Sequence, residues 1–126
     1  MAHATTIVLA AHGSRRGDAN DAHRVLTEQV AALLGSPVWP AFLELAEPSI
    51  PAAIDAAVAA GARRVQVLPY FLHPGNHTTH DLPAIVAEAG DRHPAVDISL
   101  LGLFGTDGSL AEAIAAQVRA ASDHDG

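Results

Sequence analysis

The stretch Thr6-Ile7-Val8-Leu9-Ala10-Ala11, followed directly by His12-Gly13, decides the fold of this chain. A short apolar run that stops at a glycine is typical of a buried strand that ends in a tight turn. The run is also far shorter than a signal or membrane segment, and no basic region precedes it. We therefore expect a strand here, in a cytoplasmic protein.

Three further apolar runs indicate strands. They cover Pro37–Leu43, Arg64–Phe71 and Val96–Leu101. Pro40 and Pro69 weaken the first two predictions, because proline cannot donate a hydrogen bond within a sheet.

Helical patterns separate and follow these runs. Ser49 to Ala60 has Pro51 in its first turn and Gly61 after its end, which is the usual asymmetry of a helix. A third helix is expected to begin between Thr78 and Pro83, and to run to about Ala89 before Gly90; a fourth covers Ser109 to Ala121. A first helix, Asp18 to Leu34, stops at Gly35 and places Ala22, Val25, Leu26, Val30, Leu33 and Leu34 near a 3.6-residue period.

The order of elements is strand and helix in alternation. Parallel strands need crossover connections of this length, so the sequence predicts an α/β fold with a four-stranded parallel sheet and helices on both faces. With 126 residues, 49% of them apolar, the chain fits one domain over residues 1–126, and we expect residues 122–126 to be a disordered tail.

Charge and cysteine content exclude several functions. The net charge is −7 and the basic residues, all arginines, are dispersed, which argues against a nucleic-acid partner. The chain has no cysteine, so any transition metal must be held by imidazole or carboxylate, and eight histidines are available.

Ligands of open parallel sheets bind outside the carboxyl ends of the strands, where this sequence is polar. His12 follows the first predicted strand and Glu44 the second, so an imidazole and a carboxylate are expected at one edge. His12 could equally be a histidine hydrogen-bonded into the strand end, and Glu44 could be a solvated side chain.

The segment after the third predicted strand holds His73, His77, His80 and Asp81, a density that suggests metal contact. The alternative is a solvated loop in which Thr78 and Asp81 form a capping box. His77 is the strongest candidate of the three histidines. The other histidines are expected at the surface or at caps: His3, His23, His93 and His124.

Three motifs, in the same order along nearly the whole chain, resemble those of the small CbiX/SirB-like sirohydrochlorin chelatases. They are Leu9–Arg15, then Phe42–Glu44 with Glu47–Ser49, and then Leu68–Leu72 leading through Gly75-x-His77 to Asp81–Pro83.

The resemblance implies a flavodoxin-like chelatase fold in which His12 and His77 are the two active-site histidines and hold the metal, with Glu44 as a further catalytic group. It implies no permanent cofactor: the divalent metal, Co²⁺, Fe²⁺ or Ni²⁺, is a substrate, inserted into sirohydrochlorin for cobalamin or siroheme biosynthesis. Longer relatives carry two such units, so a homodimer is implied. Substrate carboxylates are expected to meet Ser14, Arg15 and the backbone near Gly13 and Gly75.

Two other functions remain open from the residues themselves. The His73–His80 cluster could belong to a metal carrier that stores or delivers Co²⁺ or Ni²⁺ without turnover. His12 could be the nucleophile of a phosphate-transfer enzyme, but Ala11 stands where that class needs an arginine.

Overall fold

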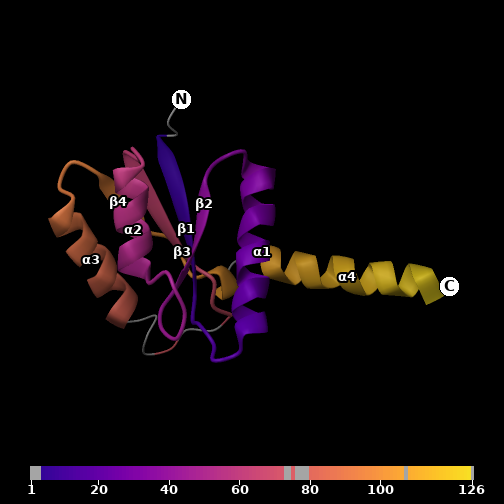
Figure 1. Cartoon of the computed structure of the whole chain (residues 1–126). Helices are drawn as coiled ribbons and strands as arrows, with labels where there is room; N and C mark the ends of the chain where they lie inside the picture. Colours follow the sequence, from indigo (N-terminus) through magenta and orange to yellow (C-terminus); the bar gives the residue numbers. More distant parts are fainter. Residues whose placement is uncertain (1–3, 73–74, 76–79, 107, 126) are drawn as a thin grey trace.

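One parallel sheet of four strands, in the order β2-β1-β3-β4, organises the chain in the computed structural model, which describes residues 4–72, 75, 80–106 and 108–125 (Figure 1). Central β1 pairs with β2 and β3, so Val8 lies opposite both Trp39 and Val67. The predicted parallel α/β sheet is confirmed. The strands are β1 (Thr5–Ala11), β2 (Val38–Phe42), β3 (Arg64–Pro69) and β4 (Asp97–Leu100).

Both strand prolines occupy positions that a sheet tolerates. Pro40 lies in β2, which is an edge strand, and Pro69 is the last residue of β3. At an edge or at a strand end, a missing N–H removes little of the hydrogen-bond ladder.

Helices cover both faces of the sheet, as the sequence predicts. α2 and α3 lie on one side of the sheet and α1 on the other (Figure 1). No helix in the described ranges is long and apolar enough to span a membrane. The helices are α1 (Gly17–Leu34), α2 (Ile50–Ala59), α3 (Leu82–Arg92) and α4 (Ser109–Asp125), with a 3₁₀ turn η2 (Phe104–Thr106) before α4.

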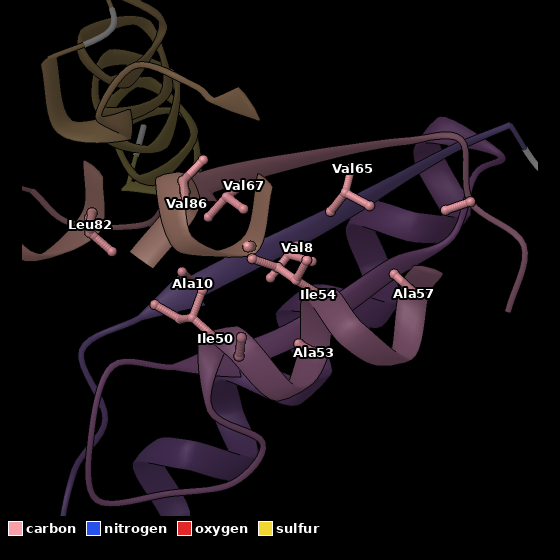
Figure 2. Packing of buried hydrophobic residues seen from close by; sticks show 13 residues of the cluster. Val8, Ala10, Ile50, Ala53, Ile54, Ala57, Val65, Val67, Leu82 and Val86 are labelled. Atoms are coloured by element: carbon pink, nitrogen blue, oxygen red, sulfur yellow. The ribbon is translucent and has the colours of Figure 1, made fainter. Parts of the chain in front are cut away.

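The main core lies between the sheet and the α2–α3 side (Figure 2). Inward-pointing strand residues such as Val8, Val65 and Val67 are fully buried and meet Ile50 and Ile54 of α2. Burying a side chain of this size stabilises the fold by about 1.5–3 kcal/mol. This core fixes the strand ends from which the site is built.

Local signals set the helix ends. Gly35 ends α1 in the left-handed conformation, at a φ of 67°, and its N–H donates to the Ala31 carbonyl. Ser49 caps α2, because its hydroxyl accepts from the Ala52 N–H at 3.2 Å, and Pro51 lies in the first turn. The predicted boundaries of both helices are confirmed to within one residue.

Two predicted helix ends are wrong. α3 continues through Gly90 to Arg92, because His93 supplies the C-cap and its N–H donates to the Ala89 carbonyl. α4 does not stop at Ala121 but continues to Asp125, so a helix occupies most of the expected tail. The Ser122 hydroxyl donates to the Val118 carbonyl one turn earlier, a bond compatible with helix.

The apolar residues whose spacing predicts α1 are not the residues that α1 buries. Its buried residues are polar: Asn20, His23 and Thr27. Two of them form hydrogen bonds to the backbone: His23 Nε2 donates to the Leu9 carbonyl at 2.9 Å, and the Thr27 hydroxyl donates to the His23 carbonyl at 2.8 Å. Several of the apolar residues are exposed instead: Val25, Leu33 and Leu34.

Candidate functional site

His12 and Glu44 lie side by side at the carboxyl edge of the sheet. The pairing of β1 with β2 continues beyond both strands, because the Leu43 N–H donates to the Ala11 carbonyl at 2.9 Å and the Glu44 N–H to the His12 carbonyl at 3.1 Å. This continued ladder brings His12 Nε2 within 3.2 Å of Glu44 Oε1. The structure therefore brings into contact two residues that the sequence predicts at one edge of the sheet.

Gly13 allows this close approach. Its φ is +97°, and a Cβ built at this position would overlap the carbonyl oxygen of Glu44. Residues with a side chain rarely adopt such a φ, and here the backbone of the neighbouring strand end also occupies the space. The glycine after His12 is thus required by contact with Glu44.

Phe71 packs beside the imidazole of His12. The two rings lie edge to face, with centroids 6.0 Å apart and an interplanar angle of 83°. Backbone bonds fix this segment, since the Tyr70 N–H donates to the Ala10 carbonyl at 2.7 Å and the Gly105 N–H to the Phe71 carbonyl at 2.9 Å. Sequence reasoning did not assign Phe71 to the site, because as part of an apolar run it is indistinguishable from a core residue.

The His12–Glu44 pair can bind a cation. Nitrogen and oxygen ligands lie about 2.1 Å from a divalent first-row metal, so atoms 3.2 Å apart would subtend about 100° at the ion. That angle suits tetrahedral or octahedral coordination. The side chains are 48% and 49% exposed, so an ion here would keep open positions for another ligand.

The second predicted imidazole, His77, lies outside the described residues, as does His73. His80, Asp81 and Gly75 are described and exposed. Within the described ranges, no group of three or more histidine or acidic side chains is positioned to hold a metal ion. The site as described is thus a two-residue site formed by His12 and Glu44.

Ser14 and Arg15, predicted to bind substrate, lie in the loop between β1 and α1. Ser14 shapes this loop: its N–H donates to Asn20 Oδ1 at 3.0 Å, its carbonyl accepts from Asn20 Nδ2 at 2.8 Å, and its hydroxyl accepts from the Arg16 N–H. Arg16 is paired with Asp18 at 2.8 Å. Arg15 is exposed and forms no ion pair with any described residue, so it is available to an anionic ligand.

The sequence predicts His23 at the surface or at a helix cap, and this prediction is wrong, because His23 is buried inside α1. Only 6% of His23 is exposed. Its ring stacks on the ring of Tyr70, with centroids 5.8 Å apart, and meets the ring of Phe42 edge to face, with centroids 5.3 Å apart. Burial lowers the pKa of His23, and the hydrogen bond to Leu9 opposes this shift only in part. Nδ1 has no partner among the described residues. His23 is thus a buried residue that packs beneath the site, and its lowered pKa favours the neutral imidazole. The sequence does not predict this burial, because the apolar residues of the same helix indicate a different buried side.

Several apolar side chains are exposed at the carboxyl edge of the sheet, which also carries His12. Leu45 is 54% exposed, Tyr70 38% and Leu72 51%, and all three follow strand ends. Leu45 also has a φ of 67°, a strained conformation that costs on the order of 1 kcal/mol or more. An exposed apolar rim of this kind suits a ligand with a flat apolar face.

Two hollows adjoin Glu44. One, of about 640 Å³, is lined by residues 42–49 and Ala52. The other, of about 360 Å³, is lined by three carboxylates, Glu44, Asp81 and Glu88, among apolar side chains. The second hollow is therefore negatively charged and favours the approach of a cation.

Comparison with known proteins agrees with the fold. The structure superposes on a putative cobalamin biosynthesis CbiX protein from Marinobacter aquaeolei VT8, with a TM-score of 0.81 and 29% identity over 95% of this chain and 98% of that one. It also superposes on the sirohydrochlorin chelatase SirB from Bacillus subtilis in complex with cobalt, with a TM-score of 0.81 and 31% identity over 93% of this chain and 50% of that one.

Curated relatives are similar in sequence. The chloroplastic sirohydrochlorin ferrochelatase of Arabidopsis thaliana is 33% identical over 94% of this chain and 53% of the relative. The sirohydrochlorin cobaltochelatase of Methanocaldococcus jannaschii is 36% identical over 69% of this chain and 62% of the relative. The chain thus spans about half the length of several curated relatives that it matches. The CbiX family model matches residues 6–121, and the chain belongs to the CbiX family.

Proposed function

We propose that this chain is a sirohydrochlorin chelatase, a lyase-class enzyme that inserts Co²⁺ or Fe²⁺ into sirohydrochlorin in cobalamin or siroheme biosynthesis. One observation carries the proposal: His12 and Glu44 lie 3.2 Å apart at an open sheet edge, in a chain of the CbiX family. The similar ferrochelatase and cobaltochelatase support the substrate and the reaction class.

Metal delivery is the first part of the reaction. His12 binds the hydrated cation, with His77 as the second imidazole, and together they displace water from the ion. A chelatase must release this metal, so an incomplete and half-exposed ligand set serves it better than a closed structural site. The acidic hollow beside Glu44 attracts the cation and favours its arrival from that side.

Proton removal is the second part. Insertion forms metal–nitrogen bonds and releases both inner N–H protons of the macrocycle. An imidazole can accept one of these protons near neutral pH, and Glu44 orients His12 or accepts the other. Because Glu44 is in contact with His12, a proton on the imidazole has a neighbouring carboxylate to stabilise its charge.

Substrate binding uses the rim of the edge. Leu45, Tyr70 and Leu72 offer exposed apolar area to one face of the ring. Arg15 and Ser14, with the backbone near Gly13 and Gly75, bind the peripheral carboxylates; Arg15 and Gly75 are exposed, which supports this role. We include a homodimer in this proposal, because several relatives are about twice as long as this chain and two copies would supply a comparable length. A nickel substrate is the alternative within the same reaction, because Co²⁺, Fe²⁺ and Ni²⁺ all accept imidazole and carboxylate ligands.

The test is multiple-turnover insertion, followed anaerobically by the visible absorption of sirohydrochlorin with Co²⁺ or Fe²⁺. We expect the wild type to exceed the spontaneous rate, and His12→Ala and His77→Ala to fall close to it. His93→Ala is the matched control, since His93 caps α3 away from the site. If the wild type binds metal stoichiometrically but shows no turnover, the chelatase proposal is contradicted and the metal-carrier function is favoured.

A further inference from the structure

The buried polar side of α1 holds the chain on both sides of His12. Asn20 and His23 lie three residues apart on this helix, so their side chains share one face. His23 Nε2 donates to the carbonyl of Leu9, which precedes His12, and the side chain of Asn20 bonds to Ser14, which follows it. The helix therefore fixes the backbone before and after the imidazole that the site uses.

Asn20 pairs with the backbone of Ser14 as a neighbouring strand would. It is only 8% exposed, its Oδ1 accepts from the Ser14 N–H at 3.0 Å, and its Nδ2 donates to the Ser14 carbonyl at 2.8 Å. A carboxamide carries a donor and an acceptor side by side, whereas a carboxylate only accepts and an apolar side chain does neither. This pair of bonds therefore needs an amide at position 20.

Close packing does not fix the loop that these bonds hold. A hollow of about 300 Å³ adjoins Gly13, Ser14 and Asn20 and extends to Tyr70. A segment beside a hollow has no van der Waals partners on that side. The position of the loop thus depends on its hydrogen bonds to Asn20.

The same bonds determine where Arg15 lies. Ser14 is held by Asn20, and the next anchored residue is Arg16, whose N–H donates to the Ser14 hydroxyl at 3.0 Å and whose guanidinium pairs with Asp18 at 2.8 Å. Arg15 stands between these two anchors, is exposed, and forms no ion pair with a described residue. Its backbone is therefore fixed while its guanidinium stays available to an anion.

We propose that Asn20 is a positioning residue that holds the Ser14 backbone so that Arg15 meets a peripheral carboxylate of the macrocycle. This inference rests on the proposed chelatase function. Asn20 acts through Ser14 and Arg15 and does not touch the substrate. The His12–Glu44 pair is held separately, by the bonds that continue the ladder between β1 and β2. Asn20 therefore sets the affinity for the macrocycle and not the affinity for the metal.

Two binding titrations of the full chain test this separation, one with metal-free sirohydrochlorin and one with Co²⁺ alone. Asn20→Leu keeps the number and branching of heavy atoms but cannot form either bond to Ser14. We expect it to raise the dissociation constant of sirohydrochlorin by about 10-fold and to leave that of Co²⁺ unchanged.

Thr27→Val is the matched control. It removes another buried polar group from the same side of α1, and Thr27 bonds to the His23 carbonyl rather than to the loop. Both dissociation constants should stay at the wild-type value. An equal rise for Thr27→Val, or an unchanged sirohydrochlorin constant for Asn20→Leu, would overturn the proposal.

Combination with Arg15→Ala tests whether Asn20 acts through Arg15. Arg15→Ala alone should weaken sirohydrochlorin binding by about 10-fold, and the double variant with Asn20→Leu should bind no more weakly than Arg15→Ala. Independent effects, which would multiply to about 100-fold, would refute this route.

Two further measurements keep the test decisive. If Asn20→Leu does not fold, Asn20→Asp replaces it: this side chain has the same size, but its carboxylate faces the Ser14 carbonyl without a donor, so sirohydrochlorin binding should again weaken. In a folded Asn20→Leu, hydrogen exchange of the Ser14 amide, followed by NMR, should be at least about 10-fold faster, while the Glu44 amide is unchanged.

The outcomes separate this inference from the proposed function. A wild type that binds sirohydrochlorin and inserts metal, with Asn20 variants that bind equally well, would overturn the positioning role alone. A wild type that neither binds sirohydrochlorin nor inserts metal would overturn the chelatase proposal, and the role of Asn20 with it.

Discussion

Replacing Gly13 by alanine perturbs the site without removing any of its functional side chains. The φ of +97° costs a residue with a side chain about 1–3 kcal/mol, and the new Cβ would overlap the Glu44 carbonyl oxygen, so the two strand ends must also separate. We expect Gly13→Ala to lower the free energy of unfolding by about 3 kcal/mol in total. With a urea dependence of about 2 kcal/mol per molar, the unfolding midpoint should fall by about 1.5 M.

Urea denaturation followed by circular dichroism measures this loss, and Gly90→Ala is its matched control. Gly90 lies inside α3 with open space around its Cβ position, so alanine there should stabilise the chain by about 0.5–1 kcal/mol. The same variants should differ in metal insertion, because separation of the strand ends moves Glu44 away from His12. If Gly13→Ala unfolded at the same urea concentration as the wild type, the close packing of Gly13 on Glu44 would be refuted.

Three further predictions concern stability and use the same urea titration. Because the pKa of buried His23 lies below its ordinary value of 6.5, the unfolded chain binds more protons as the pH falls through 6.5, so the free energy of unfolding should decrease there; His23→Gln should weaken this pH dependence. Ser49→Ala removes the N-cap of α2 and should lower the free energy of unfolding by about 1 kcal/mol. An unchanged urea midpoint would contradict a stabilising role of this cap. Asp55→Asn weakens contacts to Arg92 and His93 but should cost no more than about 1 kcal/mol, since Asp55 is 48% exposed; a larger loss would contradict this reading.

The sheet could be predicted because its signals are local and agree with one another. Four short apolar runs alternate with helical patterns, and glycines at 35 and 61 follow the ends of α1 and α2. Chain order then limits the topology, since crossovers between parallel strands are almost always right-handed. Even the prolines fit once β2 is known to be an edge strand.

The packing of α1 could not be predicted, because it depends on tertiary contacts. Its apolar period points to Val25, Leu26 and Leu33, whereas the sheet takes the polar side with His23 and Thr27. The spacing of residues in the sequence does not show that the Leu9 carbonyl accepts a hydrogen bond from His23.

The candidate site could be predicted in part. His12 and Glu44 were expected at one edge from the rule for parallel sheets, and the structure places them in contact. Phe71 and the exposed rim could not be separated from core residues by sequence, because strand-end apolar residues have the same pattern whether they pack inward or face a ligand. The role of His77 stays a prediction.

The coupling between His12 and Glu44 in metal insertion is the measurement that tests the central claim most directly. It compares kcat/KM for Co²⁺ insertion by the wild type, His12→Ala, Glu44→Gln and the double variant, each corrected for the spontaneous rate. If the two side chains act as one unit across their 3.2 Å contact, the double variant should lose little more than His12→Ala alone. Losses that multiply, or a Glu44→Gln rate equal to that of the wild type, would contradict a site built on this pair.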